Sequence, residues 1–160
     1  MHSCHSMVIR PYRDADVDAV AAIFIAAVHE GAASHYDVAQ REAWAPRQID
    51  AEYWRQRLAS LVTLVAEINA SPVGFLSFGR NGHIDLLFVS PQSVRRGVAS
   101  ALLQSATDQL AALGVSELFT EASLVARPFF ERHGFVATEE ETVERRGVTL
   151  RRYAMAKRLP

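Results

Sequence analysis

The sequence of 160 residues contains a single cysteine, Cys4, so no internal disulfide can form. Its first residues, MHSCHS, lack the charged and apolar segments of a secretory signal. Both absences favour the reducing cytosol, and we expect a cytoplasmic protein. His2, Cys4 and His5 could hold a metal, but three ligands on a frayed terminus more often belong to an extended start. We therefore expect no metal and treat residues 1–6 as a flexible N-terminal tail.

Long apolar runs and an excess of one charge are also missing. The longest apolar stretches, Val20 to Val28 and Leu61 to Ala66, are far shorter than the ~20 residues that cross a bilayer. The formal net charge of −1 gives no electrostatic footprint for nucleic acid. We expect neither a membrane nor a nucleic-acid partner, and both a monomer and a homodimer stay open.

The length suits one domain over residues 7–158, because single cores commonly reach about 100 to 200 residues. Apolar spacing and cap residues predict the elements of the first half. These are a strand at Met7–Pro11, a helix from Val17 to Val28 capped by Asp14 or Asp16, a short helix at Val38–Trp44 stopped by Pro46, a helix from Asp50 to Ser60, and strands at Val62–Ile68 and Val73–Phe78.

The second half begins with Asn81 and Gly82, the residues of a tight primed hairpin turn in which both central positions need positive φ. A strand at His83–Val89 follows. Next comes a helix from near Arg96, with Ala99, Leu102, Leu103, Ala106, Leu110 and Leu113 on one face and Gly114 as its stop. The remaining elements are a strand at Glu117–Ala122, a short helix with Pro128 in its first turn, and strands near Phe135–Val143 and Val148–Ala156.

An anion site is indicated between Val89 and Leu102, where a hydrophobic strand ends at Pro91 and a glycine opens an amphipathic helix. The first backbone N–H groups of a helix lack internal partners and favour a phosphate. Gly97 removes the side chain that would block approach, and Arg95 and Arg96 add positive charge. A lone glycine more often only permits a tight turn. The surrounding motif therefore decides whether Gly97 marks a phosphate site.

That motif resembles the signature of the GNAT superfamily of acetyl-CoA-dependent N-acetyltransferases. The signature is Arg or Gln, two residues, Gly, one residue, then Gly or Ala, after a strand that ends in an apolar, aromatic and valine triplet. Here the strand ends in Leu87, Phe88 and Val89, and the loop reads VRRGVAS over residues 94–100. Val94 departs from the first position.

A second segment, SLVARPFFERHGF at residues 123–135, is similar to the family's cofactor-binding helix. Ala126, Phe129, Gly134 and Phe135 fit in register. Ser123 stands where the family often has asparagine, and Phe130 stands where many members have the tyrosine that protonates the departing thiolate.

The resemblance implies a mixed α/β (α+β) GNAT fold. In it, helices flank a central, mostly antiparallel sheet of six to seven strands, and two splayed strands hold the pantetheine. It also implies acetyl-CoA as cosubstrate, an amine acceptor, and direct attack in a ternary complex. The implied cofactor contacts are Leu87, Phe88, Val89, Arg95, Arg96, Gly97, Val98, Ala99, Ser100, Ser123 and Phe130.

Acetyl transfer needs a neutral amine and therefore a base or a water relay. Asp85 is the first candidate, because a carboxylate on an apolar strand is costly unless it is paired or used. Strand alternation places it with His83, Leu87 and Val89, opposite Ile84, Leu86 and Phe88. Glu121 on the facing strand is the second candidate. His83, beside the turn, is more often solvated than catalytic.

With Phe130 unable to donate a proton, Tyr153 is the first alternative acid to test, ahead of Tyr36 and His133. The family builds its acceptor wall between the first two helices, which points to His29, His35, Tyr36 and Trp44 as substrate-binding residues, although each could equally pack the helices. Few acidic residues lie there, so a polycationic acceptor is not indicated.

Three rival functions are weaker. A GNAT-fold module that binds CoA without turnover fits Phe130 and Ser123. A phosphotransferase is disfavoured because the loop lacks the Lys-Ser/Thr pair of a P-loop, and Lys157 is the only lysine. No Gly-x-Ser-x-Gly turn of a serine hydrolase occurs.

Overall fold

The computed structural model describes residues 6–160. Residues 1–5 of the expected tail, with His2, Cys4 and His5, lie outside the described part. Seven strands form one sheet in the order β1-β2-β3-β4-β5-β7-β6, and every neighbouring pair is antiparallel except β4 and β5. The strands are β1 Met7–Pro11, β2 Val62–Ile68, β3 Ser71–Phe78, β4 His83–Val89, β5 Glu117–Ser123, β6 Val136–Arg145 and β7 Val148–Arg158. The predicted α/β fold with a mostly antiparallel sheet is confirmed.

Among residues 6–160, five α-helices flank the sheet: α1 Val17–Ala26, α2 Val38–Trp44, α3 Ala51–Ala59, α4 Val98–Ala112 and α5 Arg127–Arg132. The side chains of Asp37 and Asp50 accept hydrogen bonds from backbone N–H groups in the first turns of α2 and α3, which fixes where these helices begin. Asp16 occupies the N-cap position of α1, but its carboxylate accepts hydrogen bonds from the Arg13 N–H and from Arg10 instead.

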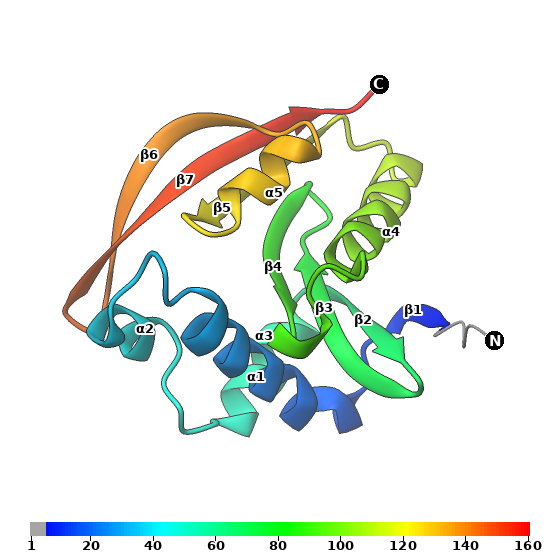
Figure 1. The fold of residues 1–160 in the computed structure, drawn as a ribbon. Coiled ribbons are helices and arrows are strands. Elements are labelled where there is room, and N and C mark those ends of the chain that lie inside the picture. Colours follow the sequence, from blue (N-terminus) through cyan, green and yellow to red (C-terminus); the bar gives the residue numbers. More distant parts are fainter. Residues whose placement is uncertain (1–5) are drawn as a thin grey trace.

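Two apolar clusters hold the helices to opposite faces of the sheet. One joins α4 and α5 to the strands through Leu102, Leu103, Leu110 and Phe130. The other joins α1 and α3 to the opposite face through Phe24, Trp54, Phe75 and Leu86. Figure 1 shows α1 and α3 below the strands and α4 beside them, while the β6–β7 hairpin arches toward α2. The sheet therefore has a separate core on each face.

A β-bulge at Asp85 changes which side chains of β4 share a face. Ser77 pairs with Leu86 and Phe78 pairs with Ile84, so Asp85 has no partner in β3. Ile84 packs with the α4 cluster, whereas Leu86 and Phe88 pack with the α1 cluster. The predicted uniform alternation, with Ile84, Leu86 and Phe88 on one face, is therefore wrong.

Helix α4 begins two residues later than predicted, at Val98, with Gly97 in the N-cap position. Val98 is buried, and Leu113 is 59% exposed although its spacing predicts burial. The cause is that Leu113 is the residue after the last helical turn, where the chain already bends toward Gly114. The other predicted apolar positions of this helix are confirmed, except that Ala99 is only partly buried.

The primed hairpin turn lies elsewhere than predicted. Of Asn81 and Gly82, only Gly82 has a positive φ, and the connection from β3 to β4 is closed by a hydrogen bond from Gly79 N–H to the His83 carbonyl at 2.8 Å. The two-residue turn with positive φ at both positions joins β2 to β3 at Asn69 (53°) and Ala70 (63°). The sequence does predict a turn at Asn69–Pro72, but Ala70 is not a residue type that signals positive φ, so the primed type of this turn was not predicted.

Gly74 on β3 lies under the start of α4. A Cβ atom there would stand 2.9 Å from Val98 Cγ1 and 3.1 Å from the Phe88 carbonyl oxygen. We expect Gly74→Ala to lower the free energy of unfolding by about 1 to 3 kcal/mol, because the added methyl overpacks this contact. Urea denaturation measures the loss. Gly31→Ala is the matched control, since nothing lies within 4 Å of its Cβ position. Equal losses in both variants would contradict this account of Gly74.

Candidate active site

The site is built where β4 and β5 separate. The two parallel strands pair only at His83 with Phe119 and at Ile84 with Thr120, and the Thr120 hydroxyl donates to the Ile84 carbonyl at 2.8 Å. The separation begins at Asp85, the bulged residue, since a bulge bends its strand. Beyond this point the edge of β4 that faces β5 has no strand partner, so its backbone groups are open to a ligand.

A cavity of about 560 Å³ occupies the space between the separated strands and the start of α4. Its size is typical of a pocket for a small molecule or cofactor. All the cofactor residues expected from the sequence line it except Arg96, namely Leu87, Phe88, Val89, Arg95, Gly97, Val98, Ala99, Ser100, Ser123 and Phe130. The structure thus brings two distant segments of the sequence together around one cavity.

The turn before α4 exposes backbone N–H groups to this cavity. Gly97 has φ of 78°, and no side chain caps the helix start. Nothing lies within 4 Å of the position of a Gly97 Cβ atom. Arg95 also has a positive φ of 66°, a conformation that costs a non-glycine residue some stability. The open N-terminus of this helix of 15 residues suits a phosphate.

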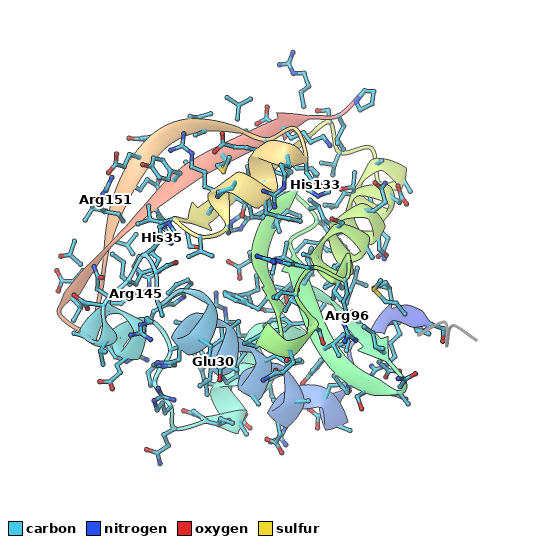
Figure 2. The ribbon with its side chains drawn as sticks, viewed as in Figure 1. Glu30, His35, Arg96, His133, Arg145 and Arg151 are labelled. Atoms are coloured by element: carbon cyan, nitrogen blue, oxygen red, sulfur yellow. The ribbon has the colours of Figure 1, made fainter. Side chains whose placement is uncertain are left out.

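His133 supports the same helix start from the end of α5 (Figure 2). Its Nε2 atom lies 3.0 Å from the Ser100 hydroxyl, and its ring packs against Phe129. Burial lowers the pKa of His133, and the nearby charges of Lys157 and Arg132 lower it further. The ring is therefore favoured in its neutral form, in which it can hold the Ser100 hydroxyl.

Part of the cavity wall comes from the end of α1, which continues as a π-helical turn at Ala27–Gly31. Such turns often occur at functional sites. Ala27, Gly31 and Ala32 line the cavity, and their small side chains leave it open. The sequence carries no local signal for this turn, because the apolar spacing of the helix runs through it.

Phe130 and Tyr153 differ in their relation to the cavity. Phe130 lines it from the α4 cluster, is 3% exposed, and packs edge-on against Phe129 and Phe135. Tyr153 lines neither this cavity nor the smaller cavity beside it. The guanidinium of Arg127 stands 4.1 Å from the centre of the Tyr153 ring. The position of Tyr153 therefore gives no support to its expected role as an acid.

A second cavity, of about 180 Å³, adjoins the first. Trp44, Phe88 and Ser123 line both cavities and thus mark their junction. Apolar and aromatic residues form much of the wall of the second cavity, and charged residues complete it. They are Phe24, Tyr36, Arg57, Asp85, Leu86, Glu121, Val143, Arg145, Leu150, Arg151 and Arg152.

Both carboxylates expected from the sequence line this smaller cavity, and each has a basic partner. Arg57 Nη2 donates to Asp85 Oδ2 at 3.3 Å. Glu121 Oε2 lies 2.6 Å from His83 Nε2, and the ring of His83 stacks on Phe119 at 4.8 Å between centroids. His83 is therefore a partner of Glu121, not the solvated side chain that its place beside the turn suggested.

The His83–Glu121 pair shifts both groups toward their charged forms. The hydrogen bond that His83 donates to Glu121 raises the pKa of His83 above 6.5 and lowers the pKa of Glu121 below 4.5. A raised histidine pKa stabilises the fold below about pH 6.5 and loses that effect as pH rises through the folded-state pKa. A lowered glutamate pKa stabilises above about pH 4.5 and loses its effect as pH falls.

We therefore expect His83→Gln to lower the free energy of unfolding most between about pH 4.5 and 6.5, by about 1 kcal/mol. Chemical denaturation of both proteins at a series of pH values measures the difference. It should shrink toward alkaline pH, where the wild-type histidine is neutral. A difference that stays constant with pH would show that packing on Phe119, not the ion pair, carries the effect.

The four expected acceptor residues occupy different environments. Trp44 and Tyr36 line the smaller cavity. The Tyr36 hydroxyl donates to the Arg151 carbonyl at 2.6 Å and accepts from the Leu124 N–H at 3.0 Å, so it also ties this loop to β5 and β7. His29 is buried with Nε2 2.7 Å from the Ala45 carbonyl oxygen, and His35 is exposed beside Ser34. Neither histidine lines either cavity.

Sequence reasoning missed the arginines of the smaller cavity, which are Arg57, Arg145, Arg151 and Arg152. Arg145 and Arg152 reach the site because the β6–β7 hairpin extends to α2, where Arg146 Nη1 donates to the Ala43 carbonyl at 2.6 Å. Figure 2 shows Arg145 in this part of the molecule. No local pattern marks them, since arginines on a solvent-facing hairpin look alike in sequence.

Within residues 6–160, no three metal-ligating side chains come close enough to form a site, and no helix combines the length and apolar character needed to span a membrane. The alternative of a metal held by His2, Cys4 and His5 concerns residues that lie outside the described part of the chain.

Residues 26–157 match the family described as the acetyltransferase (GNAT) domain. The chain belongs to this family. It is 45% identical over 147 residues to the uncharacterized N-acetyltransferase YafP of Escherichia coli K12, a match that covers 92% of this chain and 93% of YafP. Family membership at this coverage makes the chain an acetyl-CoA-dependent acyltransferase, as the sequence predicted.

Solved GNAT structures share the fold. A GCN5-related N-acetyltransferase from Rhodopseudomonas palustris superposes with a TM-score of 0.93 at 36% identity, covering 99% of this chain and 100% of the other. The PaiA N-acetyltransferase of Thermoplasma acidophilum, in complex with coenzyme A, gives a TM-score of 0.80 at 16% identity, with 96% and 99% covered. At 16% identity, the similarity to PaiA shows a shared fold and nothing further.

Proposed function

We propose that this GNAT protein transfers the acetyl group of acetyl-CoA directly to the primary amine of a small molecule or peptide held in the smaller cavity. The observation that carries the proposal is the junction of the two cavities at Trp44, Phe88 and Ser123. Both substrates can occupy adjoining spaces at once, as direct attack in a ternary complex requires.

In the proposed complex the pyrophosphate binds the N–H groups at the start of α4, with Arg95 beside it. The pantetheine runs along the unpaired edge of β4, from Val89 toward Phe88, and brings the thioester to the junction. A backbone N–H at Phe88 or Val89 then stabilises the oxyanion of the tetrahedral intermediate, a contribution worth about 3 to 4 kcal/mol in other enzymes. This assignment rests on cavity shape and on the open strand edge.

Asp85 and Glu121 are the proposed acidic groups on the acceptor side. They favour binding of the amine as an ammonium, and Asp85 accepts its proton directly or through water. The neutral nitrogen then attacks the thioester carbonyl carbon, and Asp85 passes the first proton to solvent. As the tetrahedral intermediate collapses, the carbon–sulfur bond breaks, and the second proton that nitrogen loses on becoming an amide passes to water. Glu121 is held in its charged form by His83, which makes it the better electrostatic partner and Asp85 the better proton acceptor.

Ser123 is the proposed donor to the departing sulfur, because Tyr153 lies outside both cavities. The Ser123 hydroxyl oxygen accepts a hydrogen bond from the Ala126 N–H at 3.1 Å, which leaves the hydroxyl hydrogen free to donate. Ser123 lines the junction, so this hydrogen can point at the thiolate. Water returns the proton to the thiolate.

The experiment is a thiol-release assay with acetyl-CoA and a panel of primary amines, followed by identification of the N-acetyl product by mass spectrometry. Thiol release that depends on one class of amine, with intersecting initial-rate lines, supports direct transfer. Tight CoA binding without thiol release across the panel would overturn the proposal and favour a non-catalytic CoA-binding module.

A further inference from the structure

In the smaller cavity, an acidic and a basic side chain, Glu121 and Arg152, come from neighbouring register positions of β5 and β7. Glu121 pairs with Ala154, and Ser123 pairs with Arg152, so these four side chains share one face of β5 and β7. Arg152 therefore lies directly across from the junction residue and one step from Glu121. Residues two apart along a strand are about 7 Å apart.

The guanidinium of Arg152 keeps free N–H donors beside the cavity. Its Nε donates to Glu141 at 3.0 Å, and among the described residues its side chain makes this one hydrogen bond. A guanidinium has five N–H donors in a planar fork, so both terminal nitrogens are left for a planar anion. The side chain is 30% exposed, and it lies close enough for its charge to act on Glu121 and His83.

Besides its charged residues, the cavity wall has apolar and aromatic side chains. Trp44 and Tyr36 pack edge-on at 5.4 Å, and Trp44 packs on Phe88 at 6.2 Å. Leu150 and Val143 pair across β6 and β7 on the same face as Arg152. With a volume of about 180 Å³, this wall suits one compact apolar group rather than a long chain.

We propose that the acceptor is an α-amino acid with an apolar or aromatic side chain. Its ammonium group lies by Asp85 and Glu121 at the junction, its carboxylate binds the terminal nitrogens of Arg152, and its side chain packs between Trp44 and Leu150. In an α-amino acid the ammonium and the carboxylate are attached to the same carbon. This short separation matches the placement of Arg152 one register position from Glu121. This inference rests on the proposed function for the identity of the reaction, although not for the binding itself.

The test compares phenylalanine with phenylalanine amide, which differ in the charge of the carboxyl group and hardly in shape. Calorimetric titration of each into the enzyme saturated with CoA measures affinity, and the thiol-release assay measures KM and kcat. We expect phenylalanine to bind at least about tenfold more tightly than the amide, because a charge-assisted pair is lost with the carboxylate.

Variants assign the preference to Arg152. Arg152→Gln should remove the preference for phenylalanine and leave the affinity for the amide nearly unchanged, and Arg152→Lys should restore part of it as a point charge. Arg127→Gln is the matched control. The side chain of Arg127 lines neither cavity, is 36% exposed, and pairs through Nε with Glu131 at 2.8 Å, so this variant should keep the full preference.

The outcomes separate this inference from the proposed function. Acetylation of the amide as efficient as that of phenylalanine, with equal affinities, would overturn the amino-acid assignment and leave the acetyltransferase intact. Selective binding of phenylalanine without thiol release would support the assignment and overturn the proposed function. A preference that survives in Arg152→Gln would overturn the role of this arginine.

Discussion

Replacing Gly97 by glutamate should lower the affinity for CoA by at least about a hundredfold. The substitution places a β-carbon at a φ of 78°, which side chains rarely adopt, and it adds bulk and a negative charge at the open N-terminus of α4. The glutamate carboxylate would compete with the pyrophosphate for the same N–H groups. Calorimetric titration with CoA measures the effect.

Gly114→Glu is the matched control at the other end of α4. Gly114 has φ of 84°, and nothing lies within 4 Å of its Cβ position, so the backbone strain and the added side chain are comparable. This control should lose stability without losing CoA affinity, since Gly114 does not line the cavity. Unchanged CoA affinity in Gly97→Glu would refute the assignment of the phosphate site.

Asp85→Asn should lower kcat by about a hundredfold or more and leave the affinity for CoA nearly unchanged. A positioned general base contributes about 10² to 10⁴ in rate, and asparagine keeps the shape of aspartate without its basicity. Steady-state rates at saturating acceptor, measured from about pH 6 to about pH 9, give kcat and its pH profile.

Arg57→Gln separates a base from a structural ion pair. If Asp85 accepts the proton, removing its arginine partner leaves the base in place, so Arg57→Gln should keep far more of kcat than Asp85→Asn does. If the pair is only structural, Arg57→Gln and Asp85→Asn should reduce kcat and stability alike. Rates in Asp85→Asn equal to wild type over the whole pH range would remove Asp85 from the mechanism.

The elements of the fold could be predicted from local patterns, because each rests on residues close in sequence. The cap at Asp50, Pro128 in the first turn of α5, and the stop at Gly114 lie where the sequence indicates. The proposed phosphate site lies in a segment of the same kind, since residues 94–100 contain both the turn and the start of the helix.

Features that depend on distant strands could not be predicted. The bulge at Asp85 arises from the pairing of β4 with β3, and uniform alternation hides it. Asp85 is paired by an arginine of α3, and Glu121 is paired through the register of β4 with β5. The sequence shows that these residues are carboxylates, but it does not show their partners. Arg152 reaches the cavity through the pairing of β7 with β5, which carries no signal in the local sequence.

The most direct measurement is a crystal structure of this protein with acetyl-CoA bound. We expect the pyrophosphate on the N–H groups at the start of α4, the pantetheine between the separated parts of β4 and β5, and the thioester sulfur beside Phe88 and Ser123 at the junction of the two cavities. A thioester that lies outside this junction, or a cofactor bound elsewhere with the space between β4 and β5 empty, would contradict this expectation.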